Sequence, residues 1–302
     1  MNASNGHRRQ AEETPHLPEV QEGEAAPEVR AVFEDIAATL RVPFVGLFWR
    51  VVAAEPATLR LAWEAVAPNL RTWAAERAAD TLRGRALIAE AAEISSHKAF
   101  KGDLVRAEID YDLRTKINNF NHVARYALPK HLLAVTMLAA ALEGAAVGGA
   151  NGDTSEIPRG VAAGAVPVSP LYPPLARGRA AELLPRIATA HGHPTAEDYF
   201  RSLARLPDYL SAAWNVIKPV VGDEEYVARG ESLVALAKDF VRGLPYPVVF
   251  PAGRLSPEQV GDIGQLLRLF RDSILPQTLM DAAIITVLTD GPDLAGHSPY
   301  RL

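Results

Sequence analysis

The acidic residues Glu197 and Asp198 stand beside Tyr199 in the segment TAEDYF, a combination that could activate a water molecule. A carboxylate can accept a proton from water as a general base, and a phenolic hydroxyl can hold water or substrate in position. The same acids also suit the first turn of a helix that begins after Thr195, because the helix dipole stabilises negative charge there. Two interpretations are therefore open, a catalytic site and an ordinary helix start.

The chain contains an internal repeat. Residues 42–68 align without a gap with residues 193–219 at an offset of 151, and 8 of the 27 aligned pairs are identical. A second match, at an offset of 147, aligns residues 128–144 with 275–291 in the same order. These matches predict a duplication whose halves pack about a pseudo-twofold axis, with a ligand site at their interface.

The two repeats differ in polarity at their most divergent positions. The most different aligned pairs are Phe44/Thr195, Gly46/Glu197 and Leu47/Asp198. We expect Phe44, Leu47 and Phe48 to form the apolar wall of a pocket whose polar side carries Asp198 and Tyr199. The alternative is that the three apolar residues belong to the core of a helix-packed interface.

The other polar candidates have simpler interpretations. Arg50 and Arg201 recur at equivalent positions, which favours a structural role, since a substrate clamp would be needed only once. One glycine separates His191 from His193, a spacing that suits no helical chelate, so we expect no metal site. Four further polar residues lie close together: Asn118, Asn119, Asn121 and His122. This last group could hold a water molecule or merely cap and solvate a helix.

Helical periodicity dominates the chain from Pro27 onward, and we find no alternating segment bounded by turn residues. The sequence therefore predicts an all-α fold built as a pseudodimer of two helical repeats. Its predicted parts are a mobile N-terminal arm (1–26), the first repeat (27–144), a linker rich in glycine and proline (145–173), and the second repeat with a C-terminal tail (174–302).

Composition excludes several classes of protein. The 31 basic and 36 acidic residues are interspersed and give a net charge of −5, which argues against nucleic acid or an anionic membrane as a partner. Without cysteine, the chain forms no disulfide and no thiolate metal site. The polar N-terminus lacks the apolar core of a signal peptide, and the apolar run from Leu132 to Leu142 is too short to span a bilayer. We expect a cytoplasmic protein.

Several segments resemble the group I 2-haloacid dehalogenases over nearly the whole chain: LRVPFVGLFWRVVAAEPATLRLAW, LPKHLL, VGGA followed by IPRG, DYFRSLARLPDYL, LAKDFVRGLP and SPYRL. The resemblance implies an all-α pseudodimer that needs no cofactor and is often a homodimer. It also implies hydrolysis of small 2-halo carboxylic acids by direct attack of an activated water. The alternative is a diverged member that has lost dehalogenation and binds a small ligand or catalyses another reaction in the pocket between the repeats.

The resemblance also implies site residues. The family's base is an aspartate eight residues before the proline of an LAxWP motif; counted from Pro207, that position holds Tyr199, and Asp198 precedes it by one residue. The asparagine that holds the water in the family corresponds to Leu128, which cannot hydrogen-bond water. A helix start displaced by one residue would return Asp198 toward the site. We therefore assign catalytic roles to Asp198 and Tyr199, and pocket positions to Phe44, Leu47, Phe48 and Leu128.

Overall fold

The computed structural model describes residues 17–87, 94–150, 152–291 and 297–300. Within these ranges the chain is helical, and the single bridge pairing joins Thr72 and Glu156, so the predicted all-α class is confirmed. The first half contains η1 (Glu22–Glu24), α1 (Pro27–Leu40), α2 (Leu47–Val52), α3 (Pro56–Leu70), α4 (Trp73–Arg85), α5 (Ile94–Arg106) and α6 (Tyr111–Leu142). The second half contains η3 (Pro173–Leu175), α7 (Gly178–His191), α8 (Asp198–Leu203), α9 (Pro207–Ile217), α10 (Glu224–Arg242), η4 (Ala252–Arg254), α11 (Pro257–Leu269), the π turn η5 (Phe270–Ile274) and α12 (Leu275–Asp290).

The sequence explains where many of these helices begin. Proline occupies the first turn of α1, α3, α9 and α11, where its missing N–H is not needed. Asp110 caps α6 by accepting a hydrogen bond from the backbone of Leu113 at 2.8 Å. Ser256 and Gln259 form a capping box at the start of α11. Local capping therefore sets helix boundaries before tertiary packing acts.

Corresponding helices begin at a constant spacing. Helices α7, α8, α9 and α10 start 151 residues after α1, α2, α3 and α4. At an offset of 147, the residues of α6 correspond to the continuous run of α11, η5 and α12. Trp63 and Trp214 are both buried, on α3 and α9. The spacing is what a duplication predicts, while the superposition of the two halves as similar bundles stays a prediction.

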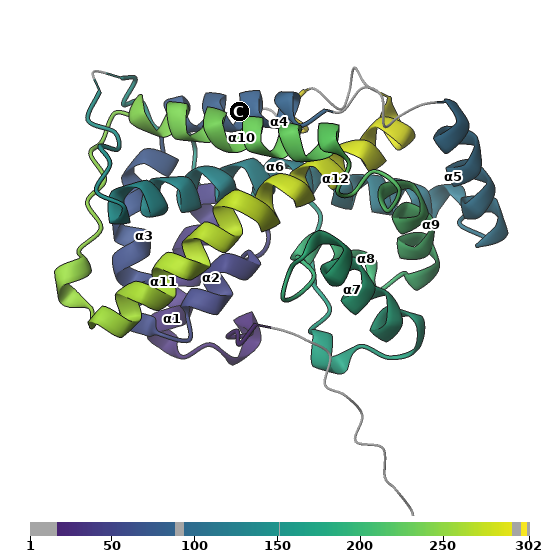
Figure 1. The fold of residues 1–302 in the computed structure, drawn as a ribbon, viewed down its shortest axis with the longest axis horizontal. Helices are drawn as coiled ribbons and strands as arrows, with labels where there is room; N and C mark the ends of the chain where they lie inside the picture. Colours follow the sequence, from purple (N-terminus) through teal and green to yellow (C-terminus); the bar gives the residue numbers. More distant parts are fainter. Residues whose placement is uncertain (1–16, 88–93, 151, 292–296, 301–302) are drawn as a thin grey trace, which may run out of the picture.

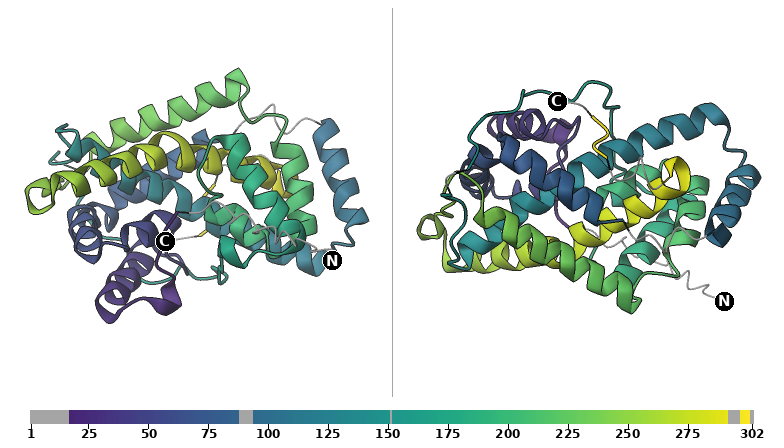
Figure 2. Two further views of the ribbon diagram at one scale, coloured as in Figure 1. Left: turned by 60° about the horizontal axis from the view of Figure 1, so that its bottom comes forward. Right: turned by 90° about the horizontal axis from the view of Figure 1, so that it is seen from above.

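Long helices run across one side of the molecule, the upper side in Figure 1. Helix α6 packs against α12, and α4 and α10 lie alongside α6. Helices α1–α3 lie toward one end of this layer and α7–α9 toward the other. Both views of Figure 2 place α5 at the outer edge, and it packs against α9, so a helix of the first half covers one of the second. In Figure 1, α2 and α8 both lie below α4, α6 and α10.

Two segments that composition assigned to an arm and a linker are held in place. In the arm, Val20 donates its backbone N–H to Arg50 at 3.0 Å, and the side chain of Glu19 is fully buried. Glu19 and Val20 therefore contact the first half of the chain, and residues 1–16 lie outside the described ranges. The linker forms no helix in its described part before η3, yet Gly160 hydrogen-bonds Ala38 at 2.8 Å. None of the described helices is long and apolar enough to cross a membrane.

Candidate active site between the two halves

Asp198 begins helix α8 and points toward the first half of the chain. The preceding Glu197 caps the helix by accepting a hydrogen bond from the Tyr199 backbone N–H at 2.7 Å, which fixes the helix start. Asp198 accepts two hydrogen bonds from Arg50 on α2, Nη1 to Oδ2 and Nη2 to Oδ1, both at 2.8 Å. Both side chains are buried. The pair therefore joins α8 to α2 across the interface of the two halves.

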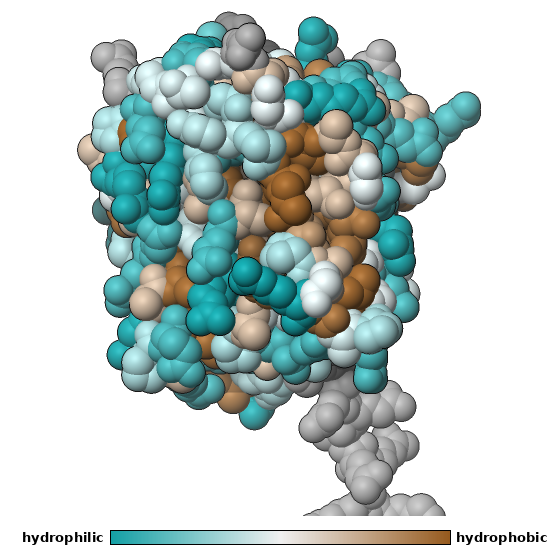
Figure 3. Space-filling model, turned by 90° about the vertical axis from the view of Figure 1, so that its left-hand side faces the viewer, coloured by the Kyte–Doolittle hydropathy of each residue, from teal (hydrophilic) through white to brown (hydrophobic). Residues whose placement is uncertain are grey.

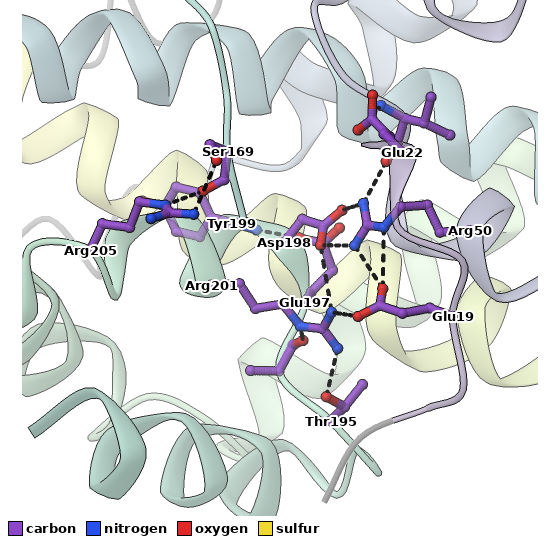
Figure 4. Close-up of polar contacts among 12 residues, drawn as sticks. Glu19, Glu22, Arg50, Ser169, Thr195, Glu197, Asp198, Tyr199, Arg201 and Arg205 are labelled. Atoms are coloured by element: carbon purple, nitrogen blue, oxygen red, sulfur yellow. Dashed lines mark hydrogen bonds and ion pairs between the residues drawn. The ribbon is translucent and has the colours of Figure 1, made fainter. Parts of the chain in front are cut away.

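Glu19 connects the two equivalent arginines (Figure 4). Its Oε2 accepts from Arg50 Nη2 at 2.8 Å, and its Oε1 accepts from Arg201 Nη1 at 2.7 Å. Each arginine also donates to the backbone carbonyl five residues before it, at Val45 and at Ala196. Arg50 and Arg201 thus share Glu19 as a partner. Glu19 was not identified from sequence, because the arm around it has no periodicity.

The two neighbouring carboxyl groups have opposite pKa shifts. Burial and the charge of Asp198 raise the pKa of Glu197 from 4.5 to about 8. Burial alone would also raise the pKa of Asp198, but the Arg50 guanidinium outweighs it and holds the pKa below its usual value. Asp198 is therefore ionised, and each of its oxygens accepts a hydrogen bond from Arg50. Near neutral pH the pair carries one proton, on Glu197.

Tyr199 points the other way, toward α6. Its ring stacks on Phe120 with centroids 5.7 Å apart and planes at 12°. Its hydroxyl is buried and has no hydrogen-bond partner among the described residues. Burial, followed by the charges of Tyr209 and Asp281, raises the pKa of Tyr199 well above 10, so the hydroxyl stays protonated and can donate to a ligand. Asp198 and Tyr199 thus lie on opposite sides of α8 and do not converge on one point.

The predicted apolar wall is buried. Phe44, Leu47, Phe48 and Leu128 are all at most 6% exposed. Phe48 packs edge-on against Phe270 of the π turn at 5.4 Å, as a core residue does. Phe44 lies edge-on to His131 of α6 at 6.2 Å, with Leu128 nearly one turn earlier on the same helix. Phe44 and α6 therefore meet at the interface.

His131 was not identified from sequence. Its ring lies against Gly46, where an added Cβ would come within 2.5 Å of Cε1. Burial lowers the pKa of His131 to about 4, although the nearby Asp198 opposes this shift, so the imidazole is neutral. Its Nε2 is buried without a partner in the described part of the chain. The signal was the Gly46/Glu197 difference between the repeats, since only a glycine leaves room for the ring.

The members of the asparagine-rich group on α6 differ in their hydrogen-bond partners. Asn118 Nδ2 donates to Asp290 Oδ1 at 2.9 Å, and His122 Nε2 lies 2.7 Å from Asp290 Oδ2. Asn121 is fully buried beside the Tyr209 hydroxyl, and neither amide atom makes a hydrogen bond of acceptable geometry within the described ranges. Asn121 is thus the member of the group that keeps free hydrogen-bonding capacity inside the protein.

The paired histidines are held by protein groups. His191 Nε2 lies 2.9 Å from Asp281 Oδ2, and His193 Nε2 lies 3.0 Å from Ser273 Oγ. Among the residues that the structure describes, no three His, Asp or Glu side chains are grouped to hold a metal ion. The described polar side chains of the interface are carboxylates, arginines, Tyr199 and His131.

Comparison with known proteins identifies the family. The chain is 31% identical over 296 residues to a "2-haloacid dehalogenase, configuration-inverting" from Alcaligenes xylosoxydans xylosoxydans, covering 95% of this chain and 98% of that protein. The chain belongs to this 2-haloacid dehalogenase family. A second dehalogenase of the same name, from Pseudomonas sp. (strain 113), is 27% identical over 87% of this chain and 88% of its own length. No family model matches the sequence.

Solved structures of dehalogenases share the fold. A D-2-haloacid dehalogenase mutant with D-2-CPA has a TM-score of 0.77 at 23% identity, covering 92% of this chain and 96% of its own. A D-2-haloacid dehalogenase with L-LA has a TM-score of 0.78 at 24% identity, covering 92% and 97%. In this dehalogenase-family chain, α8 starts in register with α2. That register pairs Asp198 with Leu47 at the first position of the two helices.

Proposed function

We propose that the chain is a hydrolase that removes the halide from carbon 2 of a small 2-halo carboxylic acid. The observation that carries this proposal is the 31% identity, over 95% of the chain, with a relative named configuration-inverting 2-haloacid dehalogenase. A water oxygen attacks carbon 2 and forms the new C–O bond, while the halide leaves with the electrons of the C–halogen bond. The water's proton passes to a carboxylate, and the product is the 2-hydroxy acid of inverted configuration.

The proposed proton acceptor is the Glu197–Asp198 pair rather than Asp198 alone. A good general base has a pKa near the working pH, which Glu197 meets with a pKa of about 8 and Asp198, held lower by Arg50, does not. Ionisation of Glu197 makes the pair basic, so turnover should rise as pH increases through about 8. Glu197→Gln should remove this rise, while wild type retains it.

Isotope labelling and halide release test the reaction together. Purified protein is incubated with L- and D-2-chloropropionate, and chloride and lactate are measured. A single turnover in H₂¹⁸O with enzyme in excess should put ¹⁸O into the first lactate formed, because the attacking oxygen comes from water. Unlabelled lactate would indicate attack by a protein carboxylate, and no chloride release from either enantiomer by folded protein would overturn the proposal.

The proposal includes a small carboxylic acid as the ligand, a homodimer and a cytoplasmic location. Support for a homodimer comes from the family resemblance and from the surface. Figure 3 shows an apolar band flanked by polar residues on the end of the molecule that carries α1 and α3. Apolar patches of this kind are commonly covered by a partner. Sedimentation velocity over a range of concentrations tests whether the chain forms a dimer.

A further inference from the structure

Arg125 lies in the middle of α6 with an unused edge on its guanidinium. The residue is 1% exposed, and its Nε and Nη2 are buried without a hydrogen-bond partner in the described chain. These two nitrogens form one side of the guanidinium, the edge that binds both oxygens of a carboxylate in parallel. A buried guanidinium edge of this kind is costly unless a ligand or water occupies it.

The surroundings of Arg125 favour an anion over water. Burial and the charge of Arg83 lower the pKa of Arg125 to about 10, so the group remains a cation at neutral pH. Arg83 on α4 is also fully buried, with Nε and Nη1 unpartnered within the described residues. The acid whose charge acts on Arg125 is Asp290, whose oxygens are bound by Asn118 and His122. Arg83 pairs with the partly exposed Asp80, whereas Arg125 forms no ion pair with a carboxylate among the described residues.

A cavity lies beside Arg125, and a further hydrogen-bond donor lies near the guanidinium. Arg125 lines a cavity of about 390 Å³ together with Asn118, His122, Asp290 and Ser298. This volume suits a small organic ligand. On the inner side, Tyr199 interacts electrostatically with Arg125, and its protonated hydroxyl has no partner among the described side chains.

We propose that Arg125 binds the carboxylate of a small organic acid through Nε and Nη2, with the Tyr199 hydroxyl as a further donor. The identity of this acid as the 2-halo substrate rests on the proposed function, whereas the carboxylate site itself does not. Leu128 lies one turn beyond Arg125 on α6 and His131 one turn further, ~9 Å from Arg125 along the helix axis.

Binding of an unreactive acid tests the site apart from catalysis. Isothermal titration calorimetry compares propionate with its neutral isostere propionamide. Propionate should bind the wild-type protein, and the amide should bind at least ~10-fold more weakly, since charge-assisted hydrogen bonds are lost. Equal affinities, or no saturable binding of propionate, would overturn the proposal without any mutation.

Substitutions then assign the effect to Arg125. Arg125→Gln should weaken propionate binding by roughly 10- to 100-fold, and Arg125→Lys should do so less, because lysine keeps the charge but not the paired donors. Arg205→Gln is the matched control, since Arg205 hydrogen-bonds Ser169 at the surface and should leave affinity unchanged. Without ligand, Arg125→Gln should unfold at the same or a higher denaturant concentration than wild type; clear destabilisation would indicate a structural arginine and overturn the proposal.

Chloride release separates the two proposals. Arg125-dependent propionate binding without chloride release from 2-chloropropionate would retain this inference and reject the dehalogenase function. Chloride release with an unchanged KM in Arg125→Lys would retain the function and reject this inference.

Discussion

Arg50 and Asp198 form a bidentate ion pair between residues 148 positions apart in sequence, with both Nη–Oδ distances at 2.8 Å. Each residue belongs to a short helix of a different half, and Glu19 binds Arg50 from the other side at 2.8 Å. The buried pair fixes the orientation of α8 against α2. The orientation of α8 in turn sets the direction of the Tyr199 side chain toward α6.

Breaking this pair should destabilise the fold strongly. Asp198→Asn leaves Glu19 as the single carboxylate bonded to both Arg50 and Arg201, and breaking a buried ion pair typically costs ~3–5 kcal/mol. The free energy of unfolding from urea titration measures the effect. Asp239→Asn is the control, because its ion pair with Arg242 is more than half exposed and contributes under ~1 kcal/mol. Similar effects of the two substitutions would contradict a structural role for Asp198.

The pKa of Glu197 predicts a pH dependence of stability. Its pKa is higher in the folded chain, about 8, than the ordinary 4.5, so the folded state holds the proton more tightly. The stability linked to this proton is complete below pH 4.5 and is lost as pH rises through 8. Glu197→Gln stays neutral, so its urea midpoint should rise relative to wild type between about pH 5 and about pH 9. A constant difference over this range would place Glu197 in an ordinary solvated environment.

The sequence predicted the helical class and the positions where the repeats differ, because both depend on local patterns. Periodicity and capping are properties of neighbouring residues. The structural role that the recurrence of Arg50 and Arg201 favoured stays a prediction. The ion-pair partners of these residues could not be predicted from the sequence. Glu19 lies in a segment without periodicity, and its two arginine partners come from distant helices.

The sequence also could not predict the direction in which the side chains point. Spacing placed Asp198 and Tyr199 next to each other, but only the packing of α8 shows that they face opposite ways. Arg125 likewise has the sequence appearance of a solvated arginine inside a helix. Its burial follows from the packing of α4 and α12 against α6, which no local pattern records.

Gly46 should be intolerant of a larger residue. In Gly46→Ala the new Cβ would lie 2.5 Å from Cε1 of His131, so the ring must move within a packed interface. Overpacking of this kind costs ~1–3 kcal/mol, measurable as a lower urea midpoint. Gly261→Ala on α11 is the control, because its added Cβ meets no atom within 4 Å. Rescue of Gly46→Ala by His131→Ala would confirm the contact, whereas equal stability of the two glycine variants would rule it out.

Tyr199→Phe should separate function from stability. The substitution removes a buried hydroxyl that lacks a partner among the described residues, and it keeps the ring stacked on Phe120 at 5.7 Å. Since an unpaired buried hydroxyl carries a desolvation cost, the free energy of unfolding should stay equal or rise by up to ~1 kcal/mol. Turnover of 2-chloropropionate should fall by roughly 10- to 100-fold, because the hydroxyl is the proposed donor to the bound ligand.

The control is Tyr111→Phe at an exposed tyrosine at the start of α6, which should change neither the free energy of unfolding nor the turnover. Unchanged kcat and KM in Tyr199→Phe would remove Tyr199 from the site. A large loss of stability would mean that its hydroxyl has a structural partner after all.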